Sequence, residues 1–229
     1  MTPIPLRPGP LRLVIFDCDG VLVDSEGPAS RVTAREVSLL GWPMTAEEAM
    51  ARFTGLRLSD LPPMVAAHTG RPAPDGWVEH VRARLIATLG EETEAMPGAA
   101  EVLRATAALG LPYRVASNSS HEEMAVKFAR TGLTPLVAGR VHSARDVAAG
   151  KPAPDVFLAA AAAEGVAPGA CVVVEDSLPG IAGALAAGMA CIGLDPHGSG
   201  EVLRAAGARP VRALSELPAL FGAAMRAAA

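Results

Sequence analysis

The chain has 229 residues, a formal net charge of −4 and 50% hydrophobic residues, which is enough apolar material for a substantial buried core. Aromatic residues make up only 3% of the chain, and no basic run is present, so the composition argues against a nucleic-acid partner. No stretch reaches the roughly 18 consecutive apolar residues that indicate a membrane span. Because the net charge is negative and no basic run is present, an anionic ligand must be bound by a few local cations and a metal ion.

The three cysteines indicate a reducing environment. Cys18, Cys171 and Cys191 are odd in number and show no Cys-x-x-Cys spacing, so we expect free thiols rather than a disulfide framework. The first ten residues are rich in proline and lack the apolar segment of a signal peptide. We therefore expect a cytoplasmic protein.

Short apolar runs, each followed by turn residues and a helical pattern, recur along most of the chain. The runs are Leu11–Phe16, Tyr113–Ala116, Cys171–Val174 and Ala190–Leu194, and helical patterns begin near Ser119, Pro154 and Pro179. This alternation predicts parallel strands joined by helical crossovers, and thus an α/β fold with a doubly wound, Rossmann-like sheet. We expect Val211–Ala213 to add an edge strand before a final helix.

Residues 25–94 break this rhythm. They contain no convincing strand, and glycine and proline separate four helical patterns: Pro28–Leu40, Thr45–Phe53, Ser59–His68 and Asp75–Leu89. We expect an α/β core domain made of residues 1–24 and 95–229, and an inserted helical cap domain made of residues 25–94. Because the insertion follows the first strand, the cap is expected to cover the ligand-binding edge of the sheet.

Polar residues follow the predicted strands. They are Asp17 and Asp19 after the first strand, Ser117 after the second, Lys151 in the loop before a later helix, and Glu175 and Asp176 after a further strand. In open α/β sheets, ligands bind beyond the carboxyl ends of the strands. We therefore expect these side chains to converge on one site.

Asp17 and Asp19 are the candidate catalytic pair. At positions i and i+2 of an extended chain, their carboxylates lie on one face, about 6–7 Å apart. One can attack a phosphorus atom while the other protonates the departing oxygen and later deprotonates water. Cys18, between them, should point to the opposite face and pack in the core. The alternative is a pair of aspartates that only stabilise a turn.

Ser117 and Asn118 offer a hydroxyl group and amide groups for the oxygens of a phosphate, assisted by the N-terminus of the next helix. Ser119 and Ser120 each precede a glutamate by three residues, so one of them is expected to cap that helix, and we treat both as structural.

Lys151 lies in a loop stiffened by Pro152 and Pro154. Its ammonium group can neutralise both an attacking carboxylate and a transferring phosphoryl group. Taken alone, a loop lysine is more often a solvated surface charge. We interpret Lys151 as a site residue because polar residues also follow the predicted strands.

Glu175 and Asp176 indicate a metal site. Adjacent carboxylates facing Asp17 would repel one another unless a cation lay between them, and oxygen ligands without His or Cys favour Mg²⁺. The alternative is that Asp176 or Ser177 simply caps the following helix.

Four segments together resemble the motifs of the haloacid dehalogenase superfamily. They are Phe16–Glu26, Ser117–Asn118, Gly150–Asp155 and Val174–Ile181. Their order and spacing agree with the family over nearly the whole chain. The most similar subgroup carries a helical cap after the first motif and includes β-phosphoglucomutase and many sugar-phosphate phosphatases.

The resemblance implies a role for each matching residue. Asp17 would form the aspartyl-phosphate, Asp19 would serve as general acid and base, and Ser117 and Lys151 would hold the phosphoryl group. Magnesium would be bound by Asp17, the backbone carbonyl of Asp19, and Asp176, with Glu175 either ligating or beside the ligands. Asp19 also separates the chain from the dehalogenases, which lack an acid there.

Two departures from the mutase pattern favour hydrolysis. Ala29 occupies the position of a cap histidine, and Thr54 stands before Gly55 where the mutase has a lysine. We therefore expect a phosphatase that acts on a small phosphorylated metabolite, with Arg57 contacting the distal end of the substrate. We expect the protein to be a monomer or weak homo-oligomer. A phosphosugar mutase and a non-catalytic phosphate-ligand sensor are the alternatives.

Overall fold

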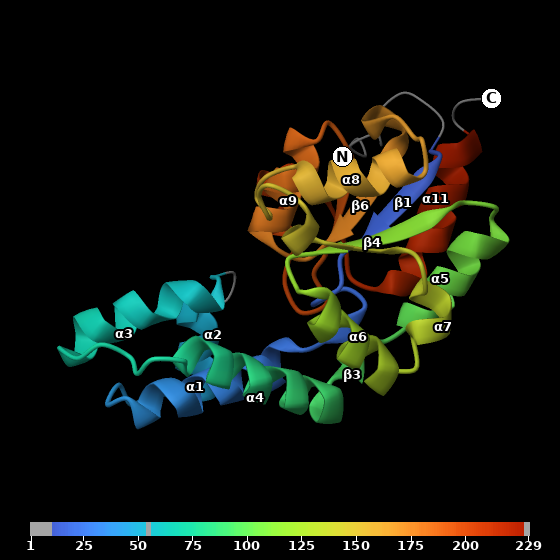
Figure 1. Ribbon diagram of the computed structural model, residues 1–229. Helices are drawn as coiled ribbons and strands as arrows, with labels where there is room; N and C mark the ends of the chain where they lie inside the picture. The colour runs from blue at the N-terminus through green and yellow to red at the C-terminus, as the bar shows by residue number, and fades with distance from the viewer. Residues whose placement is uncertain (1–10, 54–55, 227–229) are drawn as a thin grey trace. The chain divides into compact units, whose positions relative to one another are not determined.

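The structure is a computed structural model that describes residues 11–53 and 56–226 (Figure 1). The chain divides into two compact units: a core unit up to Val23 and from Ala95 onward, and a helical unit from Asp24 to Glu94. The first division lies one residue before the boundary expected from the sequence. The role of the helical unit as a cap remains a prediction.

The core unit is built on a parallel sheet. Among the described residues the sheet has six strands in the order β5-β4-β1-β6-β7-β8, and every strand pairing is parallel. The strands are β1 (Leu13–Phe16), β4 (Tyr113–Ser117), β5 (Val141–Ser143), β6 (Cys171–Glu175), β7 (Ala190–Leu194) and β8 (Arg209–Val211). The predicted α/β fold with a doubly wound sheet is thereby confirmed.

The sheet reverses its winding direction at β1. From β1 the chain adds β4 and then β5 on one side, and later β6, β7 and β8 on the other. Phe16, the last residue of β1, is in register with Val115 of β4 and Val174 of β6. The carboxyl end of β1 therefore lies between two neighbouring strands at the switch point, where open α/β sheets bind their ligands.

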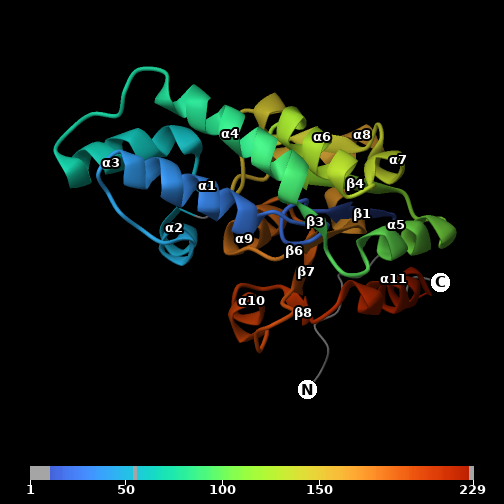
Figure 2. The same ribbon diagram turned by 90° about the horizontal axis from the view of Figure 1, so that it is seen from below.

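Helices cover both faces of the sheet (Figures 1 and 2). One face packs against α5 (Ala99–Ala108), α6 (His121–Arg130), α7 (Thr134–Val137) and α11 (Leu217–Arg226). The other face packs against α8 (Asp155–Ala163), α9 (Leu178–Ala186) and α10 (Glu201–Ala205). Short 3₁₀ turns, η2 (Ala144–Asp146), η3 (Pro168–Ala170) and η4 (Leu214–Glu216), lie between these elements.

The sequence of β1 explains why both faces are covered. Val14 and Phe16 belong to one apolar cluster, and Leu13 and Ile15 belong to the other. Successive side chains of a strand point to opposite faces, so a continuous apolar run must be buried on both sides. All four residues are fully buried. This fixes the strand whose end carries Asp17.

The helical unit has its own apolar core. Its elements are α1 (Glu26–Leu39), α2 (Ala46–Phe53), η1 (Leu58–Asp60), α3 (Leu61–Thr69) and α4 (Trp77–Glu92). Trp42 belongs to this core, edge-on to Phe53 with ring centroids 5.7 Å apart and stacked on His68 at 4.3 Å. Two short strands, β2 (Val23–Asp24) and β3 (Glu94–Ala95), pair where the chain enters and leaves the unit (Figure 2).

Local differences from the sequence prediction have simple causes. The expected edge strand at Val211–Ala213 lies two residues earlier, at Arg209–Val211. β5 was not predicted because Val141–Ser143 is a three-residue edge strand with a histidine at its centre and no apolar run. No helix in the described part of the chain is long and apolar enough to cross a membrane.

Phe221→Ala should destabilise the core unit. Phe221 is fully buried on α11, and its ring meets that of Phe16 edge-on at 6.4 Å. Truncating a buried phenylalanine costs about 3–5 kcal/mol. Equilibrium unfolding in urea measures the change, and Met225→Ala, at a partly buried position on the same helix, should lose clearly less. Equal losses in the two variants would contradict the packing described here.

Candidate active site

Asp17 follows β1 and is held in place by its neighbour β6. Its backbone N–H donates to the carbonyl of Val174 at 2.9 Å, and only 6% of the residue is exposed. Gly20 then turns the chain with a φ of +75°. A Cβ at Gly20 would lie 2.0 Å from the Asp176 carboxylate, so the turn admits only glycine if Asp176 is to keep its position.

Lys151 joins two of the predicted acids. Its Nζ lies 2.5 Å from Asp17 Oδ1 and 2.6 Å from Glu175 Oε1. The side chain is 4% exposed, and the ammonium also lies 4.9 Å from the centre of the Phe157 ring. Burial alone would lower the pKa of Lys151, but the two carboxylates more than offset it and hold the pKa above its usual value. Lys151 therefore stays charged inside the site.

Glu175 is fully buried and accepts four hydrogen bonds from described residues. Lys151 donates to Oε1, while the backbone N–H groups of Asp176 and Ser177 and the Ser177 hydroxyl donate to Oε2. Gly180 makes room for it, because a Cβ there would lie 1.9 Å from the carboxyl carbon. With its acceptor capacity largely taken up, Glu175 organises the loop after β6.

The sequence allowed either Asp176 or Ser177 to cap the helix after β6, and the structure shows that Ser177 is the cap. Its hydroxyl oxygen accepts the N–H of Gly180 at 3.1 Å and so caps α9. Asp176 is therefore not the N-cap of α9.

Asp17, Glu175 and Asp176 form an acidic cluster suited to a metal ion. Each offers one carboxylate oxygen, and these oxygens all lie within 4.8 Å of one another. Burial, and then the charge of Glu175, raise the pKa of Asp17 to about 7, although Lys151 opposes the shift. A bound divalent cation would relieve this repulsion, and three carboxylates are the hard oxygen donors that such a cation prefers.

Asn118 holds Lys151 from the backbone side. Its Oδ1 accepts the Lys151 N–H at 2.9 Å, and its Nδ2 donates to the Lys151 carbonyl at 3.2 Å. A Cβ at Gly150 would lie 2.7 Å from this amide, so the loop approaches it closely. The predicted contact of Asn118 with phosphate remains a prediction. In the structure, the side chain of Asn118 holds the loop that carries Lys151.

Asp19 lies in a separate set of contacts. Its Oδ1 is 2.6 Å from the Nζ of Lys127, and its Oδ2 accepts the hydroxyl of Ser119 at 2.9 Å and that of Ser117 at 3.3 Å. Ser117 is buried and in turn accepts the N–H of Ser119. Its side chain thus orders the groups around Asp19.

Lys127 and Ser119 were both missed as site residues by the sequence analysis. Ser120 caps α6 in a capping box with Glu123, as expected for one of the two serines, but the Ser119 hydroxyl contacts Asp19 instead of capping. Lys127 lies in the second turn of an amphipathic helix and resembles a surface residue there. A signal existed, however: of 20 basic residues in the chain, only Lys127 and Lys151 are lysines.

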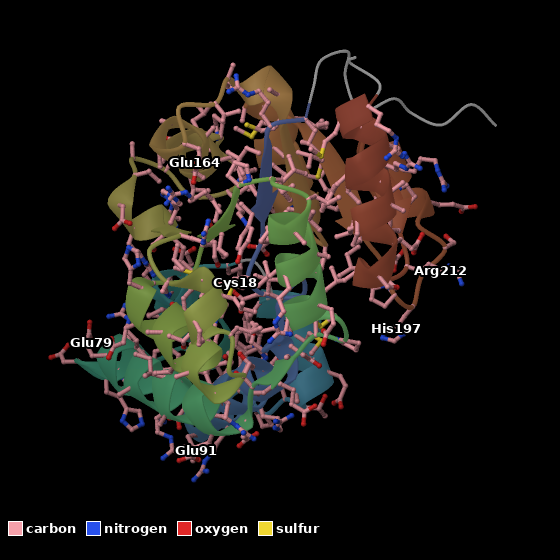
Figure 3. The ribbon with its side chains drawn as sticks, turned by 90° about the vertical axis from the view of Figure 1, so that its right-hand side faces the viewer. Cys18, Glu79, Glu91, Glu164, His197 and Arg212 are labelled. Carbon is pink, nitrogen blue, oxygen red and sulfur yellow. The ribbon has the colours of Figure 1, made fainter. Side chains whose placement is uncertain are left out.

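Cys18 is a core residue, as predicted. It is fully buried, belongs to the same apolar cluster as Phe16, and lies inside the core unit in Figure 3, whereas His197 and Arg212 lie at its surface. Burial, followed by the charge of Asp19, holds the pKa of the thiol well above its usual value. A thiol that is buried and held protonated in this way is a poor nucleophile.

The predicted specificity residue belongs to the helical unit. Arg57 is exposed, and its backbone N–H donates to the Asp60 carboxylate at 3.1 Å. Its contact with a substrate stays a prediction. Thr54 and Gly55, on which part of the distinction from the mutase rests, lie outside the described residues.

The fold and this constellation of acids and lysines are those of a hydrolase of the haloacid dehalogenase type, and known proteins agree. The model of the haloacid dehalogenase-like hydrolase family matches residues 11–188. The chain therefore belongs to this family. The predicted family membership is confirmed.

Individual relatives place the chain more closely. It is 32% identical to 6-phosphogluconate phosphatase of Escherichia coli over 82% of this chain and 85% of that enzyme. It is 35% identical to hexitol phosphatase A of the same organism, over 76% and 78% of the two chains. The structure of a putative β-phosphoglucomutase from Thermotoga maritima matches with a TM-score of 0.75 and 25% identity over 93% and 99%. The chain is thus a phosphoric monoester hydrolase of the β-phosphoglucomutase-like subgroup.

Gly180→Ala should destabilise the protein, although alanine normally favours a helix. The new methyl group would displace the buried Glu175 carboxylate, and with it the contact to Lys151, at a cost of about 2–4 kcal/mol. Gly222→Ala on α11 is the matched control, because within the described part of the chain its Cβ meets only the tip of Arg226 at 3.4 Å. It should be neutral or gain about 0.5–1 kcal/mol. Urea unfolding compares the two, and a neutral Gly180→Ala would refute the close approach.

Proposed function

We propose that the chain is a magnesium-dependent phosphatase that hydrolyses a small phosphorylated metabolite through an aspartyl-phosphate on Asp17. The observation that carries the proposal is the environment of Asp17. This residue is buried, paired with Lys151 at 2.5 Å, and grouped with the carboxylates of Glu175 and Asp176.

In the first half-reaction, a carboxylate oxygen of Asp17 attacks the phosphorus atom and the bond from phosphorus to the leaving oxygen breaks. Asp19 donates a proton to that oxygen, so an alcohol departs rather than an alkoxide. Lys151 keeps its positive charge beside Asp17, which favours the approach of a phosphate anion to a carboxylate. Ser117 and Lys151 are the proposed ligands of the phosphoryl oxygens.

In the second half-reaction, water attacks the phosphorus atom of the aspartyl-phosphate. Asp19, now ionised, accepts a proton from this water, and the bond to the Asp17 oxygen breaks. Inorganic phosphate leaves and both aspartates return to their starting state. The two halves require one residue to act as acid and then as base, which suits a carboxylate held by hydrogen bonds at the edge of the site.

Magnesium fits the donor set. The proposed ligands are the carboxylates of Asp17 and Asp176 and the backbone carbonyl of Asp19, with Glu175 holding the loop beside them. When bound, the ion would offset the negative charge around Asp17 and polarise a phosphoryl oxygen of the substrate. Lys127 pairs with Asp19, and Lys151 pairs with Asp17 and Glu175. A bound cation would add further positive charge beside the cluster of Asp17, Glu175 and Asp176.

The proposed substrate is a sugar phosphate or a related monoester. The names of two relatives, 6-phosphogluconate phosphatase and hexitol phosphatase A, support this class. Ala29, in place of the mutase histidine, supports water rather than a second sugar as the acceptor. Phosphorus NMR of the products tests this, since a mutase would interconvert isomers with little free phosphate and a sensor would bind without turnover.

The cellular setting also remains a proposal. All three cysteines are buried and free, which agrees with a reducing, cytoplasmic environment. A monomer or weak homo-oligomer is proposed for the solution state, which light scattering would measure.

Asp17→Asn should abolish phosphate release from a panel of phosphorylated sugars and sugar acids. The amide cannot form the aspartyl-phosphate, so the rate should fall at least about 10³-fold, to the level without added magnesium. Asp75→Asn makes the same chemical change at an exposed position in the helical unit and should retain activity. Phosphate release that persisted in purified Asp17→Asn would end the nucleophile assignment.

Magnesium binding should release protons at pH 6 but not at pH 8.5. With a pKa of about 7, Asp17 is largely protonated at pH 6 in the metal-free protein and must lose its proton to bind the ion. At pH 8.5 it is already ionised, so the apparent affinity should rise between the two values. Calorimetric titration in two buffers of different ionisation enthalpy counts the protons.

Asp17→Asn is the control for this titration, because its side chain has no proton to release. An equal proton count at the two pH values, or a release unchanged in Asp17→Asn, would contradict the assignment of the raised pKa to Asp17.

A further inference from the structure

We propose that Lys127 is a positioning residue that, together with Ser119, fixes the carboxylate of Asp19 for proton transfer. The inference rests on the proposed function, because it assigns Asp19 the exchange of protons with the leaving group and with water. None of the reaction steps described above uses Lys127, and yet its ammonium group contacts one of the two aspartates on which those steps depend.

Lys127 is unusual because it is charged and almost wholly buried. Its side chain is 3% exposed, whereas lysine is rarely buried without a partner. The Nζ atom lies 2.6 Å from Asp19 Oδ1 and 2.8 Å from Ser119 Oγ. The Ser119 hydroxyl in turn donates to Asp19 Oδ2 at 2.9 Å. Lysine, serine and aspartate thus close a triangle that restrains both oxygens of the carboxylate.

The position from which Lys127 reaches Asp19 is rigid. Lys127 belongs to α6, whose N-terminus is fixed by the capping box of Ser120 and Glu123. Its helix neighbours Met124 and Phe128 are buried in the core. A flexible surface lysine would lose much conformational entropy on holding a carboxylate, but here the packing of the helix has already restricted the stem. The restraint on Asp19 is therefore part of the fold.

The basic residues of the chain are distributed in a way that singles out this contact. Eighteen of the 20 are arginines, and the only two lysines contact the two aspartates of the first motif, Lys151 with Asp17 and Lys127 with Asp19. An ammonium is a compact charge on a narrow stem, whereas a guanidinium is a wide planar fork. Both aspartates are therefore paired with a lysine ammonium, and the arginine guanidinium groups lie at other positions.

The consequence of losing Lys127 follows from what Asp19 does. Without the ammonium, the carboxylate of Asp19 loses the ion pair that restrains its Oδ1 and can rotate away from the leaving oxygen. Its side chain is 28% exposed, so it can be solvated and the fold need not fail. Reactions that need a proton on the leaving group should slow, and reactions with a good leaving group should not. General acid catalysis is worth about 10²–10⁴-fold, and mispositioning should remove part of it.

The test uses Lys127→Met with two probes of similar size, phenyl phosphate and p-nitrophenyl phosphate. For phenyl phosphate, kcat/KM should fall roughly 10- to 100-fold. For p-nitrophenyl phosphate, whose leaving group departs without a proton, kcat/KM should fall less than about threefold. Because kcat/KM reports only the steps up to the first irreversible one, slow hydrolysis of the aspartyl-phosphate does not obscure the comparison.

The second half-reaction gives an independent readout. In Lys127→Met, kcat for p-nitrophenyl phosphate should fall while kcat/KM holds, because Asp19 must still take a proton from water. A pre-steady-state burst of nitrophenolate equal to the enzyme concentration should appear as the aspartyl-phosphate accumulates. A lysine that served only to stabilise the fold would lower both probes together and produce no burst.

Three further variants make the result decisive. Ser119→Ala removes the bridging hydroxyl and should shift the ratio of the two probes in the same direction by a smaller factor. Leu103→Ala removes a fully buried side chain from α5, in the same apolar cluster but away from Lys127, and should leave the ratio unchanged. Lys127→Arg should not restore the ratio, because the wide fork does not fit the site of the ammonium group.

Asp19→Asn separates failure of this inference from failure of the proposed function. If Asp19→Asn discriminates strongly between the probes and Lys127→Met does not, Lys127 is not a positioning residue and the inference is overturned. If Asp19→Asn discriminates no better than wild type, the assignment of Asp19 as general acid fails, and this inference falls with it. Absence of turnover of both probes by the wild-type protein would overturn the phosphatase proposal itself.

Discussion

The structure depends on bringing several carboxylates together at the end of one central strand. Like charges so close together in a largely buried site repel each other strongly, and burial adds the cost of removing them from water. Lys151 offsets part of that repulsion by contacting Asp17 and Glu175 at once. The rest of the core unit can be understood as a support for this contact, since β1 and β6 carry the two acids and the loop clamped by Asn118 carries the lysine.

The supporting residues divide their tasks. Glu175 accepts hydrogen bonds from the turn that leads into α9. Asp176 lies against the turn at Gly20 that follows β1. Asp19 is held apart from the acidic cluster by its own lysine and two serines. The two aspartates of the first motif therefore sit in different electrostatic surroundings although one residue separates them. A nucleophile and a proton donor have different requirements, and a cation bound beside Asp17 would keep it ionised while Asp19 exchanges a proton.

Much of this could be predicted from the sequence, because the signals are local. Apolar runs of four to six residues marked β1, β4, β6 and β7, and the polar residues after β1, β4 and β6 pointed to the site. β5 and the helix α5 were missed, since Val141–Ser143 has almost no apolar signal and the stretch after residue 95 was not recognised as helical. Lys127 was missed for a different reason. Its contact with Asp19 joins positions 108 residues apart, and no periodicity reveals which residue a helix turns toward a distant strand.

The near absence of lysine has a practical consequence. The two lysines of the chain are both buried in ion pairs, so a reagent that acylates amines finds no lysine ammonium on the folded surface. Lysine labelling followed by mass spectrometry would therefore report the opening of the core unit around these pairs rather than general surface exposure. The same scarcity means that enzymes which acetylate or ubiquitinate lysines would have to reach the interior of a folded core to modify this protein internally.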